Sequence, residues 1–534
     1  MFFAVCVLVY LVATLGLSLY GFNNYYLLTR YYKSRRQAKQ ENDALRAQAP
    51  AVADLPESAL PKVLSQIPLY NEVNVAERCI RAVAAMRYPK SRHTIQVVDD
   101  SNDETCAIVD RVCEELRAQG YRIEAIRRDH RTGFKAGALK EGMLLDDSEY
   151  IAIFDGDFVP PENFLEETVP LLMADSKAGL AQARWGHLNR GESALTLAQA
   201  VGIDNHFVVE QTARCFNDLY MNFNGTAGLW RRQAINDGGG WRADTLTEDL
   251  DLSYRVQMAG WRLRFLPDLV VPAEIPASIL GFKSQQFRWA KGSIQTARIL
   301  LPKVWKRAMP LRQKVQCSFH LTQYMIHPLI FLVALVALPM AAMLDLRQLV
   351  HWTVMAAGAL FIGAAAFAPT AVLIASQTYL GRPVGRAVLS VPILMAIGMG
   401  IAVSNTKAVL EGILGVNSAF VRTPKAGDAP VKRYKVGAKL LPVFEIALGL
   451  YSLAALYYCF LTQNYPTVGF ILLYTVGFLG VGLTSLVASV DLLGFARCVR
   501  DTLLGRRCEP VEQPVPASEV STERTPSPQE VSAR

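Results

Sequence analysis

The sequence predicts an α/β domain with a parallel sheet, fused to a helical bundle that spans a membrane. Hydrophobic residues make up 51% of the 534-residue chain, and they concentrate at the N-terminus and beyond residue 315. Between these regions, short β-branched runs alternate with helical stretches, which is the pattern of a parallel sheet covered by helices. Residues 61–300 are therefore expected to form one extramembrane domain.

Residues 1–24 are expected to anchor the chain in the membrane. The apolar run from Phe2 to Phe22 can span a bilayer, for which about 20 residues suffice. No small-residue cleavage site follows, which favours an uncleaved anchor over a signal peptide. Basic residues between Arg30 and Lys39 predict that the following segment is cytosolic. Residues 25–60 are then expected to be a cytosolic linker.

Four strands are predicted in the first half of the domain. Their sequences are VLSQIPLYNE, TIQVVDD, RIEAIRR and YIAIFDGD, and helices are expected through 76–86, 109–118 and 136–145. Ligands of such sheets bind outside the carboxyl ends of the strands. Acidic residues stand at two of these ends and predict one shared acidic cleft: Asp99, Asp100, Asp155 and Asp157.

Residues 319–492 are expected to form the transmembrane region. Four segments are long and apolar enough to cross a bilayer, namely 319–343, 352–376, 440–461 and 466–490. The stretch 388–403 is shorter and contains Pro392, and the basic loops on its two sides both suit the cytosol, so an interfacial or re-entrant element is expected. An amphipathic interfacial helix is expected at 301–318, and a disordered cytosolic tail at 493–534.

The net charge of +8 does not indicate a nucleic-acid partner. Many of the Lys and Arg residues flank apolar segments, where they orient a membrane protein. The nine cysteines show neither C-x-x-C spacing nor pairing with His at metal-ligand intervals. The sequence therefore predicts membrane lipid as a partner, no nucleic acid, no disulfide framework and no zinc site.

The D-G-D motif at 155–157 places two carboxylates on one turn, where they could share a divalent ion with a diphosphate. Mg²⁺ and Mn²⁺ are usually bound by such oxygen ligands. A D-x-D occurs about once by chance in a chain of this acid content, so its position after a strand carries the prediction. Asp99 and Asp100 can accept hydrogen bonds from a base or ribose, or be simple turn acids. Lys135, just before a helix, could contact phosphate.

Glu248 and Asp249 stand at the predicted start of a helix of about three turns. Thr247 suits the N-cap, and Gly260 suits the residue that ends the helix. A carboxylate at this end accepts backbone N–H bonds, so we expect it to be ionised and fixed, as a general base must be. The alternative is that both are ordinary first-turn acids, which the helix dipole favours.

Two further stretches offer groups for a phosphorylated sugar. The stretch SQQFRWAKGS contains Gln285, Arg288 and Trp289. Arg288 offers a planar fork to phosphate oxygens, and Trp289 offers a face on which a sugar ring can stack. Trp and Arg are also common where a protein meets a membrane surface. In NFNGTAGLWRR, the triplet Asn224, Gly225 and Thr226 predicts a tight turn with small polar groups near a ligand.

The ordered set D-D (99–100), D-x-D (155–157), T-E-D (247–249) and Q-x-x-R-W (285–289) resembles the membrane-embedded, processive members of glycosyltransferase family 2. These include cellulose, hyaluronan and chitin synthases. One branch of this family is resembled in particular: the cellulose-synthase-like A and C proteins, which are glucomannan and glucan synthases, and their bacterial relatives. The stretches that carry this resemblance are NFNGTAG, GGGW, TEDLDL and QQFRWAKG. The resemblance implies a GT-A-type fold, a bacterial inner-membrane location and a cytosolic catalytic domain.

The resemblance also implies roles for single residues. Asp249, beside Glu248, would take the proton from an acceptor hydroxyl as it attacks the anomeric carbon of an α-linked nucleotide sugar, which gives a β-linkage. The donor would be GDP-mannose or UDP-glucose, the acceptor the growing glycan, and the cofactor Mg²⁺ or Mn²⁺. A gating-like loop is implied at 405–438. The remaining roles are Asp155 and Asp157 for the metal; Asp99, Asp100, Lys135, Asp155, Gln285, Arg288 and Trp289 for the donor; and Asn224, Gly225, Thr226 and Trp289 for the acceptor.

Two other functions fit parts of the sequence. A non-processive transferase that acts on a lipid acceptor shares D-x-D and the acidic base, but it commonly lacks Q-x-x-R-W. A transporter with a nucleotide-sensing domain would need charges within the membrane, whereas the acids of the apolar region mostly stand near segment ends. A processive, exporting β-glycan synthase is therefore favoured, with the sugar left open.

Overall fold

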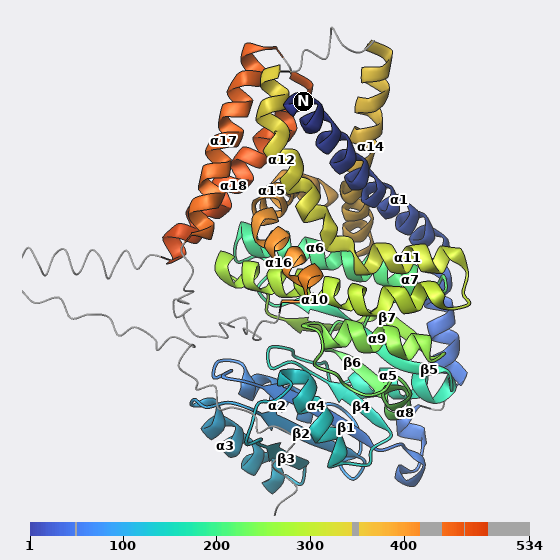
Figure 1. The fold of residues 1–534 in the computed structure, drawn as a ribbon. Coiled ribbons are helices and arrows are strands. Elements are labelled where there is room, and N and C mark those ends of the chain that lie inside the picture. The colour runs from blue at the N-terminus through green and yellow to red at the C-terminus, as the bar shows by residue number, and fades with distance from the viewer. Residues whose placement is uncertain (49–50, 344–351, 417–439, 464, 490–534) are drawn as a thin grey trace, which may run out of the picture. The chain divides into compact units, whose positions relative to one another are not determined.

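The computed structural model describes residues 1–48, 51–343, 352–416, 440–463 and 465–489 (Figure 1). A seven-stranded sheet with the order β3-β2-β1-β4-β6-β5-β7 forms the centre of the α/β domain. The predicted parallel sheet is confirmed for the first four strands, whereas β6 runs antiparallel to β4 and β5. The strands are β1 (Val63–Leu69), β2 (His93–Asp99), β3 (Arg122–Ile126), β4 (Tyr150–Ile153), β5 (Ala178–His187), β6 (Gly228–Arg231) and β7 (Arg262–Ala273).

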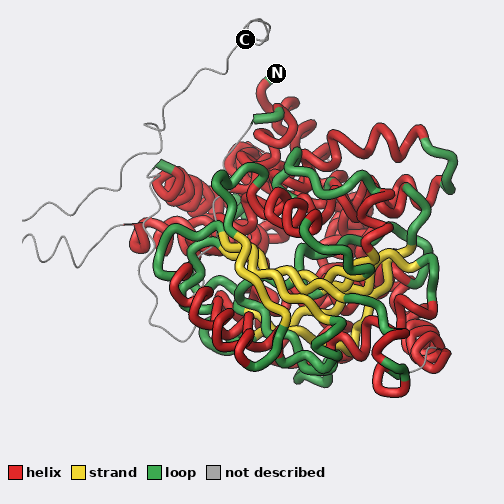
Figure 2. Tube along the Cα trace, turned by 90° about the horizontal axis from the view of Figure 1, so that it is seen from below, coloured by secondary structure: helices red, strands yellow, loops and turns green. Residues whose placement is uncertain are grey.

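The sheet is buried on both faces because helices cover both (Figure 2). In β1, Val63 and Ile67 pack in one apolar core, while Leu64 belongs to a second core with Leu139 and Leu252. Successive side chains of a strand point to opposite faces, so a strand covered on both sides is largely apolar. The covering helices are α2 (Ala76–Ala84), α3 (Thr105–Ala118), α4 (Phe134–Leu144), α5 (Phe164–Ala174), α8 (Arg232–Asp237) and α9 (Glu248–Met258).

A group of helices with polar and apolar sides joins the sheet to the apolar helices. Ser193 caps the first of them in a capping box with Thr196, and Ser278 accepts a bond from Gly281 N at the start of another. The group comprises α6 (Ala194–Asn205), η3 (His206–Gln211), α7 (Thr212–Cys215), α10 (Ile279–Lys306) and α11 (Leu311–Leu321). Short 3-10 turns occur at η1 (Val52–Asp54), η2 (Glu57–Ala59), η4 (Gln323–Met325) and η5 (Tyr465–Thr467).

In the described part of the chain, five helices are long and apolar enough to cross a membrane. A further pair, α15 (Val384–Gly400) and α16 (Ala402–Leu414), bends by 48° and has the geometry of a broken span or a re-entrant loop. The pair contains the stretch 388–403, for which a re-entrant element was one expectation. The five are α1 (Phe2–Gln48), α12 (Ile326–Met343), α14 (Trp352–Tyr379), α17 (Leu441–Leu461) and α18 (Val468–Ser489).

Three predicted boundaries differ from the structure. The expected linker at 25–60 is helical through Gln48, because its Ala, Gln, Glu, Lys and Arg residues favour helix and Asn42 donates to Phe265 O at 3.0 Å. The expected interfacial helix at 301–318 is instead the end of α10 and most of α11, divided before Leu311 where Pro310 cannot continue a helix. The expected loop at 405–438 is helical up to Leu414. Residues 417–439 and the tail from 490 lie outside the described residues.

Candidate active site

The D-x-D motif follows β4 as a tight turn. The Asp155 N–H donates to Thr226 Oγ1 at 2.9 Å, so the buried Thr226 fixes this turn from behind. A Cβ added to Gly156 would come within 2.2 Å of Glu72 Oε2, which explains the glycine between the two acids. Asp155, Asp157 and Glu72 all line one cavity of about 180 Å³, which we call the substrate cavity. The strand-end rule therefore predicted that Asp155 and Asp157 would lie in a cleft, but it did not identify Glu72.

Lys135 places a positive charge among these acids. It follows Gly133, whose left-handed backbone (φ 72°) precedes α4. Its Nζ contacts the Asp155 carboxylate and donates to Gly225 O at 2.8 Å. Burial lowers the pKa of Lys135, but Asp155, Glu248 and Asp249 outweigh burial and raise it. The ammonium is therefore charged and lies where a diphosphate can reach it.

Glu248 and Asp249 begin α9 and face the substrate cavity. Asp249 Oδ1 accepts from Leu250 N at 2.8 Å, and a Cβ on Gly225 would lie 3.0 Å from Asp249 Oδ2, so the Asn224–Thr226 turn lies directly against this carboxylate. We expected the helix end to keep Asp249 ionised. Instead, burial and the neighbouring Glu248 raise the pKa of Asp249 to about 7, because the dipole and one backbone bond do not replace lost hydration.

Thr247 does not cap α9 with its side chain, contrary to our expectation. Its Oγ1 lies 3.2 Å from Thr296 Oγ1 on α10. A Cβ added to Gly292 would come within 2.6 Å of Thr247 Cγ2, so α10 packs directly on the turn that carries Glu248 and Asp249. This contact joins the T-E-D and Q-x-x-R-W motifs.

Gln285, Arg288 and Trp289 lie on α10 and line the substrate cavity together with the acids. Their spacing of three and four residues puts them on one side of the helix. Burial lowers the pKa of Arg288, although Glu248 and Asp155 act to raise it, and a guanidinium keeps its charge even so. Arg288 is therefore a second cation positioned for a diphosphate.

Asp99 ends β2 and Asp100 follows it, but only Asp100 lines the substrate cavity. Asp99 is buried, where it accepts from Ser101 N at 3.1 Å and from Arg127 at 3.3 Å. Asp100 receives two bonds from Arg128, at 2.9 and 2.6 Å. Two residues that the motifs did not reveal complete this end of the cavity: Arg131 lies over the Tyr70 ring at 3.4 Å from its centroid, an arrangement on which a nucleobase can stack.

A second cavity of about 570 Å³ adjoins the first, and we call it the membrane-side cavity. Its lining includes side chains from α1, α12 and α14, which are three of the five apolar helices, and from α15 of the bent pair. Both cavities are lined by Asp249, Asn224 and Trp289, so the candidate base stands where they meet. The remaining shared residues are Trp185, Ile203, Thr247 and Gln285.

The donor set fits a divalent metal ion bound together with substrate. Asp155 and Asp157 supply hard carboxylate oxygens on one turn, and Glu72 lies against the glycine between them. Among the residues that the structure describes, no group of three or more His, Cys, Asp or Glu side chains is arranged to enclose an ion. This suits Mg²⁺ or Mn²⁺, which are usually held by one or two carboxylates plus phosphate oxygens and water.

Residues 61–292 match the family described as "Glycosyltransferase like family 2". A probable glucomannan 4-beta-mannosyltransferase 9 from Oryza sativa subsp. japonica is 35% identical over 390 residues, which is 71% of each chain. The glucomannan 4-beta-mannosyltransferase 9 of Arabidopsis thaliana is 34% identical over 420 residues, or 75% of this chain and 76% of that one. A probable rice glucomannan 4-beta-mannosyltransferase 7 is 41% identical over 299 residues, and that match spans only 50% of the relative.

Among solved structures, a mannosyltransferase from Pyrobaculum calidifontis in complex with GDP-Man and Mn²⁺ aligns with 69% of this chain and 97% of that one, at 20% identity and a TM-score of 0.46. The sequence relatives match most of this chain, including the domain that carries all four motifs. The mixed α/β sheet, with its acids at the strand ends, is the GT-A-type arrangement that the motifs implied. The chain therefore belongs to glycosyltransferase family 2, as a homologue of the plant glucomannan 4-beta-mannosyltransferases.

Proposed function

We propose that this protein transfers mannose from GDP-mannose to the end of a growing β-linked mannan or glucomannan, with inversion at the anomeric carbon. Two relatives that share most of their length with this chain are named as 4-beta-mannosyltransferases, which favours a mannosyl donor over UDP-glucose. The observation that carries the proposal is the position of Asp249. It lies between a cavity with cations suited to a diphosphate and a larger cavity that reaches the apolar helices.

The described residues divide the reaction between them. Trp289 offers its ring to the terminal sugar of the acceptor, whose hydroxyl then lies beside Asp249. Asp249 removes the proton of that hydroxyl while the hydroxyl oxygen attacks the anomeric carbon of the donor from the face opposite the diphosphate. Lys135 and Arg288 stabilise the negative charge that builds up on the leaving diphosphate. The product bond is therefore β when the donor is α-linked.

A divalent ion bound by Asp155 and Asp157 would supply Lewis-acid stabilisation of the same diphosphate oxygens. Asp100, with Tyr70 and Arg131, would hold the nucleoside end of the donor. The buried Asp99 would act on the nucleotide only through the loop it orders at Ser101. The bond from Asp155 N to Thr226 Oγ1 supports a role for Thr226 in holding the D-x-D turn of the donor site.

We also propose that the polymer leaves through the membrane-side cavity, with the catalytic domain in the cytosol. Polar and aromatic side chains line this cavity, among them Gln199, Gln286, Phe319 and Tyr324, and both kinds of group bind sugars. The basic segment between Arg30 and Lys39 supports the cytosolic orientation. A non-processive transfer to a lipid acceptor is the alternative, and it requires no cavity longer than one sugar.

The test is to incubate the purified full-length protein with Mg²⁺ or Mn²⁺ and radiolabelled GDP-mannose or UDP-glucose, with Asp249→Asn as the inactive control. Ethanol-insoluble polymer from GDP-mannose that a β-mannanase degrades supports the proposal. Label found only in the chloroform phase would establish the lipid-acceptor alternative. Polymer made only from UDP-glucose would refute the donor assignment, and the absence of any Asp249-dependent product would refute the enzyme mechanism.

A further inference from the structure

A helical stretch that lines the membrane-side cavity contains an irregular segment. Directly after α6, residues His206–Gln211 form the π-helix η3, and α7 follows without a break. π-helical turns are rare and frequently mark functional sites. Asp204, just before η3, faces α14, whereas His206 lines the membrane-side cavity. The side chains on the two sides of the junction between α6 and η3 therefore have different surroundings.

His206 links a partly buried acid, Glu210, to the acceptor turn. Its Nδ1 lies 2.9 Å from Glu210 Oε2, and its Nε2 lies 3.0 Å from Asn224 Nδ2. A carboxylate only accepts and an amide nitrogen only donates, so a neutral imidazole with its proton on Nδ1 satisfies both bonds. Gln211 Nε2 donates to Asn224 Oδ1 at 2.8 Å and fixes the other end of the amide. Two residues of η3 thus determine how the Asn224 side chain is oriented.

Glu210 is suited to hold this histidine. Its other oxygen, Oε1, accepts from Arg214 Nε at 2.8 Å, and the Arg214 side chain is buried. Burial raises the pKa of Glu210, but the charge of Arg214 and the bond from His206 hold the pKa well below its ordinary value. The acid therefore remains an acceptor for the Nδ1 proton.

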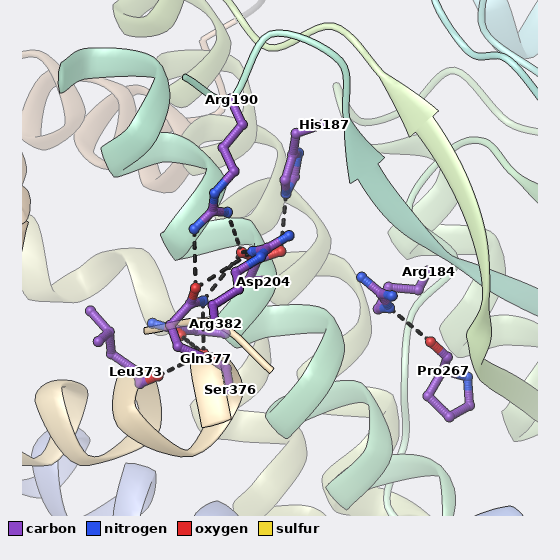
Figure 3. Close-up of polar contacts among 10 residues, drawn as sticks. Arg184, His187, Arg190, Asp204, Pro267, Leu373, Ser376, Gln377 and Arg382 are labelled. Carbon is purple, nitrogen blue, oxygen red and sulfur yellow. Dashed lines mark hydrogen bonds and ion pairs between the residues drawn. The ribbon is translucent and has the colours of Figure 1, made fainter. Parts of the chain in front are cut away.

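The other side of the helix is anchored. The carboxylate of Asp204 is fully buried and receives bonds from His187 at 3.2 Å, Arg190 at 2.6 Å, Gln377 at 3.2 Å and from Arg382 (Figure 3). These partners come from the end of β5, the loop after it, α14 and the segment after α14. Several bonds from separate segments hold the helix in place, so the His206 ring is presented to Asn224 from a fixed support.

We propose that Glu210 and His206 are positioning residues that hold the Asn224 carboxamide against a hydroxyl of the acceptor's terminal sugar. An amide –NH₂ carries two donors, and His206 accepts only one of them. Asn224 lines both cavities and immediately precedes Gly225, which lies against Asp249, so the second donor is beside the reacting hydroxyl. This inference rests on the proposed function and extends it to residues outside the four motifs.

The experiment compares His206→Leu, His206→Gln and Glu210→Gln in the full-length protein, with GDP-mannose as donor and mannohexaose as acceptor. Initial rates give the KM of each substrate, and GDP release without glycan product gives donor hydrolysis. We expect His206→Leu to raise the acceptor KM about ten-fold, the loss of one well-oriented hydrogen bond, with the donor KM unchanged. Transfer relative to hydrolysis should fall, and product chains should shorten.

His206→Gln can still accept from Asn224 and should restore most of the acceptor affinity, which a purely structural role would not predict. Glu210→Gln should lie between the two. His93→Gln is the matched control, because His93 is a buried histidine bonded to Ser65 Oγ at 2.8 Å in the sheet, away from both cavities. It is expected to lower the unfolding temperature without changing either KM.

The outcomes separate this inference from the function on which it rests. A wild-type protein that makes polymer while His206→Leu keeps its acceptor KM would refute the positioning role and leave the proposed function intact. Equal rises of donor and acceptor KM would also refute it, since they indicate general damage. A wild-type protein that is inactive with every nucleotide sugar would refute the proposed function, and this inference with it.

Discussion

The electrostatic pairing of Glu248 with Asp249 makes a quantitative prediction about pH dependence. Burial and Glu248 together raise the pKa of Asp249 from 3.8 to about 7, and only the ionised form can accept the proton of the acceptor. Replacing Glu248 with Gln removes a negative charge beside Asp249 and should therefore lower this pKa. The acidic limb of the pH profile of kcat/KM should move toward lower pH.

The size of the shift follows from Coulomb's law. At an effective dielectric of about 20, two like unit charges on neighbouring side chains repel by a few kcal/mol, and about 1.4 kcal/mol corresponds to one pKa unit. Because Lys135 already offsets part of this repulsion, we expect a fall of about one unit in Glu248→Gln. At pH 6 the ionised fraction of Asp249 would then rise from about 10% to about 50%, roughly a five-fold gain.

The assay is the pH dependence of kcat/KM for GDP-mannose between pH 5 and 9, with mannohexaose as acceptor, expressed relative to each variant's plateau. Glu114→Gln is the control, because it removes one acid from an exposed position of α3. Its profile should match that of the wild-type protein. An acidic limb of Glu248→Gln that stays in place or moves to higher pH would contradict the assignment of Asp249 as the base.

Three further predictions concern the metal and two buried ion pairs. Chelation of divalent cations should abolish transfer, and Mn²⁺ or Mg²⁺ should restore it in the wild-type protein but not in Asp157→Asn, as measured by GDP release. Asp204→Asn should lower the free energy of unfolding by about 3 kcal/mol, as measured by thermal unfolding. This is the low end of the range for a broken buried ion pair, because the side chains of its partners Arg190 and Arg382 are 23% and 32% exposed. Burial raises the pKa of Asp204 but its partners lower it to about 2, so its stabilising effect is complete above the ordinary value of 3.8, declines as the pH falls below that value and is gone once the pH has fallen through about 2. Lys283 on α10 donates to Glu445 on α17 at 2.7 and 2.8 Å. Lys283→Met should lower the free energy of unfolding by about 3–5 kcal/mol, because it leaves the Glu445 carboxylate without its partner. The double variant Lys283→Glu with Glu445→Lys, which exchanges the two charges, should recover part of this loss.

Several parts of this protein could be predicted from local sequence. The alternation of β1, α2, β2, α3, β3, α4 and β4 was predicted because each element has its own periodicity of apolar residues. The acids after β2 and β4 were brought together by the rule that parallel strands end at one edge. The five long apolar helices were predicted from length and composition alone.

Other local features were not predictable, because they depend on what packs against a segment. The region after residue 24 resembled a polar linker, but contacts such as Asn42 with Phe265 support it as a continuation of α1. The antiparallel β6 lies between β4 and β5, and no local pattern specifies that neighbour. Thr226 belonged to a motif whose position was clear, but its bond to Asp155 N joins residues 71 positions apart.

The sequence by itself determined the fold class, the segments that are apolar and long enough to span a membrane, and most of the acids and cations that line the substrate cavity, because strand ends, hydropathy and motif order are properties of short stretches. The tertiary structure decided how these groups act. The pKa of Asp249 depends on burial and on its neighbours in space, and the Glu210–His206–Asn224 chain joins η3 to a turn that it meets only in the folded protein. Likewise, both cavities are lined by Asp249 of α9 and Trp289 of α10, which come together only in the folded protein. Such effects arise from contacts between distant residues, which no local pattern in the chain encodes.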